Sequence, residues 1–123
     1  MSKRFNRAKG ETGERIAEKF LKESGYRIIA RNYKTDAGEI DLVVTDDEFL
    51  VFVEVKARLS DEFGLPCEAV DRKKQCKINM VAGQFIKQNM YFGAPVRFDV
   101  IEVYFSDGSV NHIENAFDSY LKY

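Results

Sequence analysis

The sequence predicts an α/β fold whose elements follow the order helix, three strands, helix and strand. Two stretches carry apolar residues at helical spacing, from about Gly10 to Ser24 and from about Asp71 to Asn89. Between them, two apolar runs rich in β-branched residues flank the acidic sequence 46–48, which is typical of a turn. A further run of alternating polarity covers 96–104. We therefore expect an αβββαβ core followed by a small additional strand.

The first predicted helix carries an acid on its apolar stripe. Glu14 lies three residues before Ala17 and seven before Leu21, so its carboxylate is expected to point toward the core side of the helix. Helix N-termini favour negative charge, and a position in the first turn is therefore an alternative explanation for Glu14.

A short strand is expected from Tyr26 to Arg31, followed by a polar turn from Asn32 to Ala37 and then by a β-hairpin. Within the hairpin, a loop formed by Asp47 and Glu48 sets the register. The predicted strand pairs are Asp46 with Phe49, Val44 with Val51, Leu42 with Val53, and Asp41 with Glu54.

Side chains alternate across a strand, so the charged residues of the hairpin are expected to share one face. These residues are Glu39, Asp41, Glu54, Lys56 and Arg58. The opposite face is expected to form the core and to carry Ile40, Leu42, Val44, Val51, Val53, Val55 and Ala57. A slip of two residues in register would keep every charge on the same face.

This charged face is a candidate metal site. Two carboxylates opposite each other repel, and their burial is costly unless positive charge lies nearby. Lys56 supplies one charge, and oxygen ligands without nearby His or Cys favour Mg²⁺ or Mn²⁺ over Zn²⁺. A structural ion pair between Lys56 and one acid explains the same residues, and both explanations stay open at this point.

The second predicted helix begins with a basic segment. Its apolar stripe contains Ile78, Val81, Ala82, Phe85 and Ile86. Lys74 and Lys77 lie on or beside this stripe, where they either extend into solvent or reach the acidic sheet face. The loop before the helix, Ser60 to Pro66, is of a kind that can close over a site. After the strand at 96–104, Asp107 and Gly108 predict a turn into a strand from Val110 to Ile113.

Length and composition limit the organisation of the protein. With 123 residues, of which 45% are hydrophobic, we expect one domain at 10–123 and a basic, flexible arm at 1–9. The arm has no apolar stretch after it, so we expect a cytoplasmic protein without a membrane partner. Two cysteines without a CxxC motif, and a single histidine, argue against a disulfide framework or a structural zinc site.

The charge distribution favours local rather than general binding of nucleic acid. A net charge of −1 argues against a protein that coats nucleic acid. The basic arm and a cluster in the second helix are the candidate contact surfaces, and the alternative is that these lysines are a solvated helix face. The residues of the helix cluster are Arg72, Lys73, Lys74 and Lys77.

The ordered set of motifs resembles the PD-(D/E)XK nuclease superfamily and, within it, the small bacterial YraN-like (UPF0102) family of predicted endonucleases. The resemblance covers nearly the whole chain. It is carried by Gly10-x-x-Gly13-Glu14-x-x-Ala17, Gly25-Tyr26, Arg31-Asn32, Gly38-Glu39-Ile40-Asp41-Leu42, Phe52-Val53-Glu54-Val55-Lys56-x-Arg58, Lys74, Arg97-Phe98-Asp99-Val100 and His112-Ile113-x-Asn115-Ala116-Phe117. One departure is that Ile40 stands where the superfamily has Pro.

The resemblance implies a restriction-endonuclease-like αβββαβ core with a central mixed sheet flanked by helices. It implies that Asp41 and Glu54 bind a divalent metal ion, that Lys56 contacts the attacking water or the scissile phosphate, and that Glu14 completes the acidic site, as in archaeal Holliday junction resolvases.

Our leading hypothesis is therefore an endodeoxyribonuclease that depends on Mg²⁺ or Mn²⁺ and acts on DNA, with branched or repair intermediates as candidate substrates. Nucleic-acid contacts are expected from Arg58, Arg72, Lys73, Lys74 and Lys77. The alternative is a non-catalytic module that retains the nuclease fold and binds nucleic acid or protein. A third hypothesis is a subunit that is active only as a homodimer or with a partner, and RNA as substrate also stays open.

Overall fold

The computed structural model describes residues 3–58 and 70–119, and the predicted loop from Ser60 to Pro66 lies outside them. The elements of the described residues are α1 (Lys3–Glu23), β1 (Arg27–Thr35), β2 (Gly38–Thr45), β3 (Leu50–Arg58), α2 (Arg72–Asn89), β4 (Val96–Tyr104) and β5 (Val110–Phe117). This order confirms the predicted α/β class with an additional final strand. Neither helix in these ranges is long and apolar enough to span a membrane.

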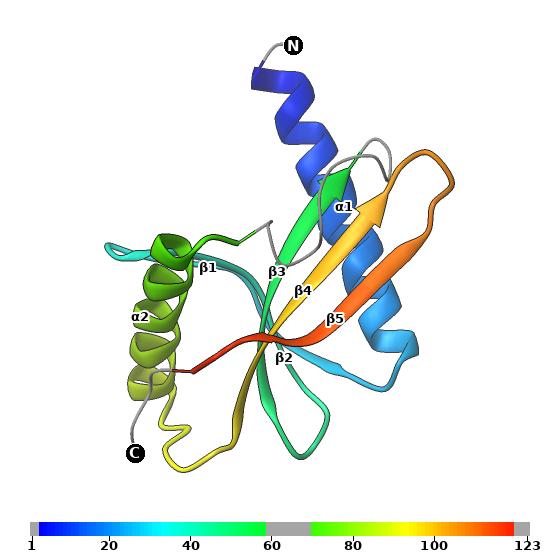
Figure 1. The fold of residues 1–123 in the computed structure, drawn as a ribbon. Coiled ribbons are helices and arrows are strands. Elements are labelled where there is room, and N and C mark those ends of the chain that lie inside the picture. Colours follow the sequence, from blue (N-terminus) through cyan, green and yellow to red (C-terminus); the bar gives the residue numbers. More distant parts are fainter. Residues whose placement is uncertain (1–2, 59–69, 120–123) are drawn as a thin grey trace.

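Across the described ranges, the strands form one mixed sheet with the order β1-β2-β3-β4-β5. Neighbouring strands are antiparallel except for β3 and β4, which run parallel. The chain returns from the end of β3 to the start of β4 through α2, since parallel neighbours require a crossover connection. Figure 1 shows α1 and α2 on opposite sides of the sheet.

Both faces of the sheet carry a hydrophobic core. On the α2 side, Phe52 and Phe98 pack with Phe85, and on the α1 side, Val53 packs with Leu21. The expectation that one hairpin face is core and the other is chemistry is therefore wrong. Phe52 shares its face with Glu54 and is 1% exposed, so the charged residues occupy only one end of a face whose remainder is buried.

The hairpin of β2 and β3 has the predicted register, with Leu42 paired to Val53 and Val44 to Val51. The turn is stabilised by the carboxylate of Asp46, whose Oδ1 accepts hydrogen bonds from the amides of Glu48 at 3.1 Å and Phe49 at 2.8 Å. These bonds are the short-range turn chemistry expected of an Asp at this place.

The predicted pairing of Asp41 with Glu54 is wrong, because the β2–β3 ladder ends at Leu42 and Val53. From that point β2 turns away from β3 together with β1 and passes toward α2 (Figure 1). This turn also places Ile40 in the core on the α2 side, whereas Leu42, which was expected on the same face as Ile40, lies in the core on the α1 side. Local rotation of the strand therefore breaks the simple alternation of side chains at Asp41.

Three element boundaries differ from the predictions. Helix α1 begins at Lys3 rather than near Gly10, since a glycine inside a helix costs only about 1 kcal/mol. Strand β1 continues through the predicted turn to Thr35, with the turn itself at 36–37. Strand β5 continues past Ile113 to Phe117. Exposed strands with polar residues, such as these two at the edges of the sheet, lack the apolar alternation that predicts a strand.

Strands β4 and β5 are joined on the α1 side by a buried carboxylate. Asp99, which is 0% exposed, accepts hydrogen bonds from the Arg97 guanidinium at 2.8 and 2.9 Å and from the Asn115 amide at 3.0 Å, and it lies 2.7 Å from His112 Nε2. Arg97 also lies against the Tyr26 and Phe49 rings and near Asp46 and Glu114. Burial acts to raise the pKa of Asp99, but the bonds from His112, Arg97 and Asn115 outweigh it and lower this pKa. The cluster is therefore a structural connection away from the Glu54 face.

Candidate active site

Asp41 lies at the point where β2 separates from β3, and its side chain replaces a lost strand hydrogen bond. Its Oδ2 accepts a hydrogen bond from the backbone amide of Val55 at 2.8 Å. A backbone amide withdrawn from water needs such a partner. The carboxylate is thereby held beside β3, at the level of Glu54 and Lys56.

Asp41 lies among several other carboxylates. Burial and the charge of Glu54 raise the pKa of Asp41 to about 7, although the Val55 amide acts to lower it. The charges of Glu14 and Glu39 add to this increase. The structure therefore brings the predicted acids Glu14, Asp41 and Glu54 near one another, without a direct strand pair between the last two.

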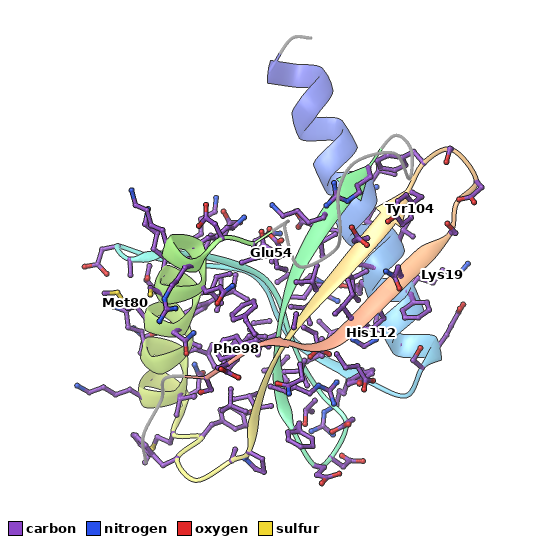
Figure 2. All side chains as sticks on the ribbon, in the orientation of Figure 1. Lys19, Glu54, Met80, Phe98, Tyr104 and His112 are labelled. Carbon is purple, nitrogen blue, oxygen red and sulfur yellow. The ribbon has the colours of Figure 1, made fainter. Side chains whose placement is uncertain are left out.

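Glu54 is 8% exposed and is bonded to a lysine of the second helix. Its Oε1 accepts a hydrogen bond from Lys74 Nζ at 2.5 Å and lies 3.8 Å from Lys56 Nζ. Figure 2 shows Glu54 on the sheet beside the N-terminal end of α2. Asp71 caps this end by accepting a hydrogen bond from the Lys74 amide at 2.8 Å, which fixes the turn from which Lys74 extends. Of the two open expectations for Lys74, the structure shows contact with the acidic face.

The two lysines at Glu54 have pKa values displaced in opposite directions. Burial and the neighbouring amine of Lys74 lower the pKa of Lys56, and attraction by Glu54 and Asp41 offsets this only in part. Burial also acts to lower the pKa of Lys74, but its hydrogen bond and charge interaction with Glu54 outweigh burial and raise it. Lys74 is therefore the counter-ion of Glu54, whereas Lys56 is the amine that releases a proton more easily.

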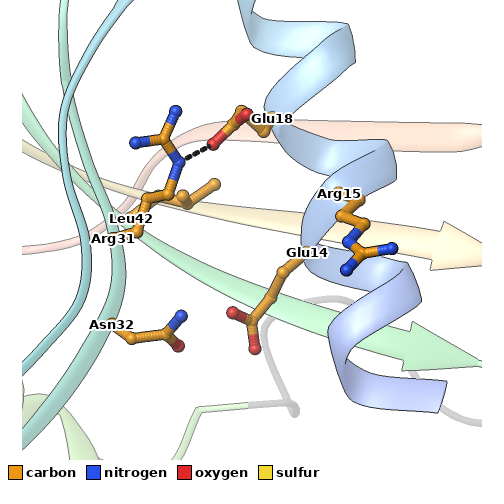
Figure 3. Close-up of a pocket in the computed structure, with 6 residues that line it drawn as sticks. All are labelled: Glu14, Arg15, Glu18, Arg31, Asn32 and Leu42. Carbon is orange, nitrogen blue, oxygen red and sulfur yellow. Dashed lines mark hydrogen bonds and ion pairs between the residues drawn. The ribbon is translucent and has the colours of Figure 1, made fainter. Parts of the chain in front are cut away.

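Glu14 extends toward the site from α1. The residue before it, Gly13, lies where α1 packs closely against β3. A methyl group added at Gly13 would lie 3.2 Å from Ala57 Cβ, so a larger side chain there would push the helix away from the strand. Glu14 itself is half-buried and lines a pocket of about 360 Å³ between α1 and β1 (Figure 3).

The donor set of this cluster fits a hard divalent cation. Its oxygens come from carboxylates, and Mg²⁺ is commonly bound through one or two carboxylates while it keeps several waters. Asp41 and Glu54 provide these two groups. No set of three His, Cys, Asp or Glu side chains at ligand spacing occurs among the described residues. Glu14 would therefore act as a third ligand only after a movement or through a water molecule.

Sequence reasoning did not identify Glu102 as part of this face. The parallel register places Glu102 beside Lys56, and its 0% exposed carboxylate binds Arg58 Nε at 2.6 Å. The Tyr104 hydroxyl and the Asn111 amide also donate to it, at 3.0 and 3.1 Å. The available signal was an acid in the middle of an apolar strand, which at such a position needs partners. Arg58, predicted to bind nucleic acid, is thus held in place by Glu102.

Comparison with known sequences identifies the family. The profile of the uncharacterised protein family UPF0102 matches residues 13–103. The chain belongs to the UPF0102 family. A UPF0102 protein of Clostridioides difficile strain 630 is 45% identical over 112 residues, covering 91% of this chain and 98% of its own length. A UPF0102 protein of Desulfosudis oleivorans is 46% identical over 112 residues, covering 91% of each chain. These names state no activity, so any assignment of function to this UPF0102 member depends on its site.

Among solved structures, the chain has a weak likeness to Pyrococcus furiosus SfsA in complex with Ca²⁺. The two share 17% identity with a TM-score of 0.35, over 89% of this chain and 63% of that protein. A likeness of this size assigns no activity to UPF0102.

The remaining predicted contact residues of this UPF0102 chain lie on the outer surface of α2. Arg72, Lys73 and Lys77 are exposed, and Lys77 lies one turn after Lys74. Their contact with nucleic acid stays a prediction. Their position at the end of α2 that also supplies Lys74 means that a strand bound there would pass close to Glu54.

Proposed function

We propose that the protein is an endonuclease that hydrolyses phosphodiester bonds in DNA and depends on Mg²⁺ or Mn²⁺. The observation that supports this proposal is the joint position of two withdrawn carboxylates, Asp41 and Glu54, and two amines, Lys56 and Lys74. A purely structural ion pair needs one acid and one base. Burial and the additional acids around Asp41 together raise its pKa to about 7, and this is an energetic cost that a bound cation would relieve.

The chain's own residues have distinct roles in this proposal. Asp41 and Glu54 would hold the cation, and the Val55 amide orients Asp41 for this task. When bound, a divalent ion lowers the pKa of a water molecule and stabilises negative charge on phosphate oxygens. Lys74 would leave Glu54 and turn to the phosphate, because the cation replaces it as the counter-ion of that carboxylate.

Hydrolysis requires a proton acceptor as well as charge stabilisation. Water adds to phosphorus, and its proton passes to a base. The bond from phosphorus to the leaving oxygen breaks with its electron pair on that oxygen, which takes up a proton from solvent. The lowered pKa of Lys56 means that its amine releases a proton more easily than an ordinary lysine, which suits it to relay this proton. Its ammonium form then stabilises the charge that develops on the phosphate.

Single-turnover cleavage of linear, flapped and four-way DNA with Mg²⁺ or Mn²⁺ tests the proposal. Lys56→Ala is expected to lower the cleavage rate by about 10²-fold or more, because stabilisation of charge is lost at the reacting phosphate. Mn²⁺ affinity should be kept or increased in this variant, since the site becomes more negative. Lys19→Ala, at an exposed lysine of α1, is the matched control and should keep the wild-type rate.

The results for cleavage and for metal affinity distinguish a nuclease from a non-catalytic binding module. A loss of cleavage without a loss of metal affinity in Lys56→Ala supports catalysis. If the wild-type protein cleaves no DNA or RNA substrate with either metal, the catalytic proposal fails, and a non-catalytic module or an enzyme that needs a partner replaces it.

A further inference from the structure

The pocket between α1 and β1 adjoins the proposed site and shares Glu14 with it, but the hydrolysis described above uses none of its other lining residues. Its volume of about 360 Å³ falls within the range of small-ligand sites. Figure 3 shows Glu14 of α1 and Asn32 of β1 pointing into the space between the two elements. The lining residues are Glu14, Arg15, Glu18, Arg31, Asn32 and Leu42.

Asn32 is directly connected to the proposed site by the strand register. It lies between the pairs Arg31–Leu42 and Tyr33–Ile40, which places it opposite Asp41 on the neighbouring strand. Its φ of 48° is a left-handed conformation in the middle of an extended strand. Among the described residues, its side-chain amide has no hydrogen-bond partner. Asn adopts this conformation more readily than most residues, and it leaves the exposed side-chain amide of Asn32 beside the pocket, where a ligand can reach it.

The other lining groups supply a mixed polar and apolar surface. Leu42 is 2% exposed and contributes an aliphatic wall. Arg31 is held at the rim by an ion pair with Glu18, and Arg15 is an exposed cation on the adjacent helix face. A ligand with a flat, partly apolar body, polar edges and an attached phosphate matches these groups. An isolated anion matches less well, because Glu14 and Glu18 would repel it.

We propose that this pocket receives a single unpaired nucleotide of the DNA strand, next to the phosphodiester held at Asp41 and Glu54. This proposal rests on the nuclease function proposed above. The amide of Asn32 carries both a donor and an acceptor, as the edge of a base requires. Arg15 and Arg31 contact the phosphate on the far side of that nucleotide. A paired base would bring its partner strand against α1 or β1, so the pocket selects DNA with an unpaired nucleotide beside the cleavage point.

Binding of a fluorescent base tests this proposal without cleavage. A duplex that contains a single unpaired 2-aminopurine is titrated with protein in the absence of metal, alongside the same duplex with 2-aminopurine paired. The wild-type protein is expected to bind the first DNA about tenfold more tightly and to change its fluorescence. Asn32→Gly removes the amide but tolerates the positive φ, so this variant should lose the preference without backbone strain. Arg27→Ala, at another exposed arginine of β1, is the control and should keep it.

The results for the pocket and for hydrolysis are distinguishable. If fluorescence depends on Asn32 but no DNA is cleaved with metal, the nuclease function fails and the nucleotide pocket stands. If paired and unpaired substrates are bound equally by wild type and Asn32→Gly, the pocket proposal fails, even where cleavage is observed. An absence of any DNA binding by the wild type overturns the pocket proposal as well.

Discussion

Asp41 and Asp99 are both withdrawn from solvent, yet their pKa values move in opposite directions. Burial acts to raise both, and the difference lies in what surrounds each carboxylate. Asp99 is surrounded by donors from Arg97, His112 and Asn115, which lower its pKa. Asp41 has one backbone donor and several acids around it. A buried acid with complete partners indicates structure, whereas one among other acids indicates a site that binds positive charge.

At the scale of single residues, Asp99 should govern stability in acid. Its folded pKa lies below the unfolded value of 3.8, so its contribution is complete above that value and is lost as pH falls below it. Thermal melts from about pH 4 down to about pH 2 should therefore show a steep decrease in Tm for the wild type. Asp99→Asn should be less stable at neutral pH, by about 3–5 kcal/mol, with a flatter pH dependence.

The control for this measurement is Asp118→Asn, at an exposed carboxylate, which should keep the wild-type slope. Parallel slopes in the wild type and Asp99→Asn would assign the acid sensitivity to other carboxylates.

Among the elements, α2 has two functions, one on its apolar face and one at its N-terminal turn. Its apolar face completes the core around Phe85, while its N-terminal turn delivers Lys74 to Glu54. The Asp71 cap connects these functions, since it fixes the first turn relative to the packed body of the helix. The basic residues that follow the cap are therefore at a defined place beside the proposed site.

Lys77 and Lys87 offer a matched comparison on this element, because both are exposed lysines of α2, the first in its N-terminal half and the second in its last turn. Lys77→Ala should weaken DNA binding and reduce the slope of log affinity against log salt by about 0.9, the value of one lost phosphate contact. Lys87→Ala should leave both unchanged. Equal effects of the two substitutions would indicate general electrostatic attraction rather than a contact at the N-terminal end.

For the whole molecule, the sequence was sufficient where local patterns coincide with tertiary structure. The order of elements, the range of β4 and the Leu42–Val53 register were all predicted correctly. Helix α2 was also predicted closely, because its Asp71 cap and apolar repeat are local signals. The alternation of side chains along β3 was sufficient to predict that Glu54 and Lys56 share one face of the sheet.

The features that were not predicted correctly depend on the path of the chain in space. The separation of β2 from β3 at Asp41 follows from sheet twist and from packing against α2, and no pair of neighbouring residues encodes it. The pocket at Asn32 forms only because β1 passes beside α1. The left-handed backbone of Asn32 was not predicted, because the segment that contains it was predicted to be a turn. The role of Glu102 required knowledge that β4 lies parallel to β3.

Metal binding should stabilise the whole fold. A ligand that binds only the native state adds about 2.7 kcal/mol at a concentration one hundred times its Kd, so saturating Mn²⁺ should raise the Tm of the wild type by several degrees. Asp41→Asn retains an oxygen for the Val55 amide but lacks the charge, so its response to Mn²⁺ should be weaker. Glu48→Gln in the exposed hairpin turn is the control. The same midpoint shift in wild type and Asp41→Asn would remove Asp41 from the metal site.

The hydrogen bond from the Val55 amide to Asp41 has a consequence for how this protein can change over evolutionary time. A lineage that no longer needed hydrolysis would still be under selection to keep an oxygen acceptor at position 41, since the sheet would otherwise contain an unpaired amide. Within the part of the chain that the structure describes, Lys56 interacts with the charged side chains of Glu54 and Lys74, and it is not bound to a backbone group of the sheet in this way. Descendants that had lost activity would therefore be expected to lose Lys56 first, and retention of Lys56 is a better marker of catalysis than retention of Asp41.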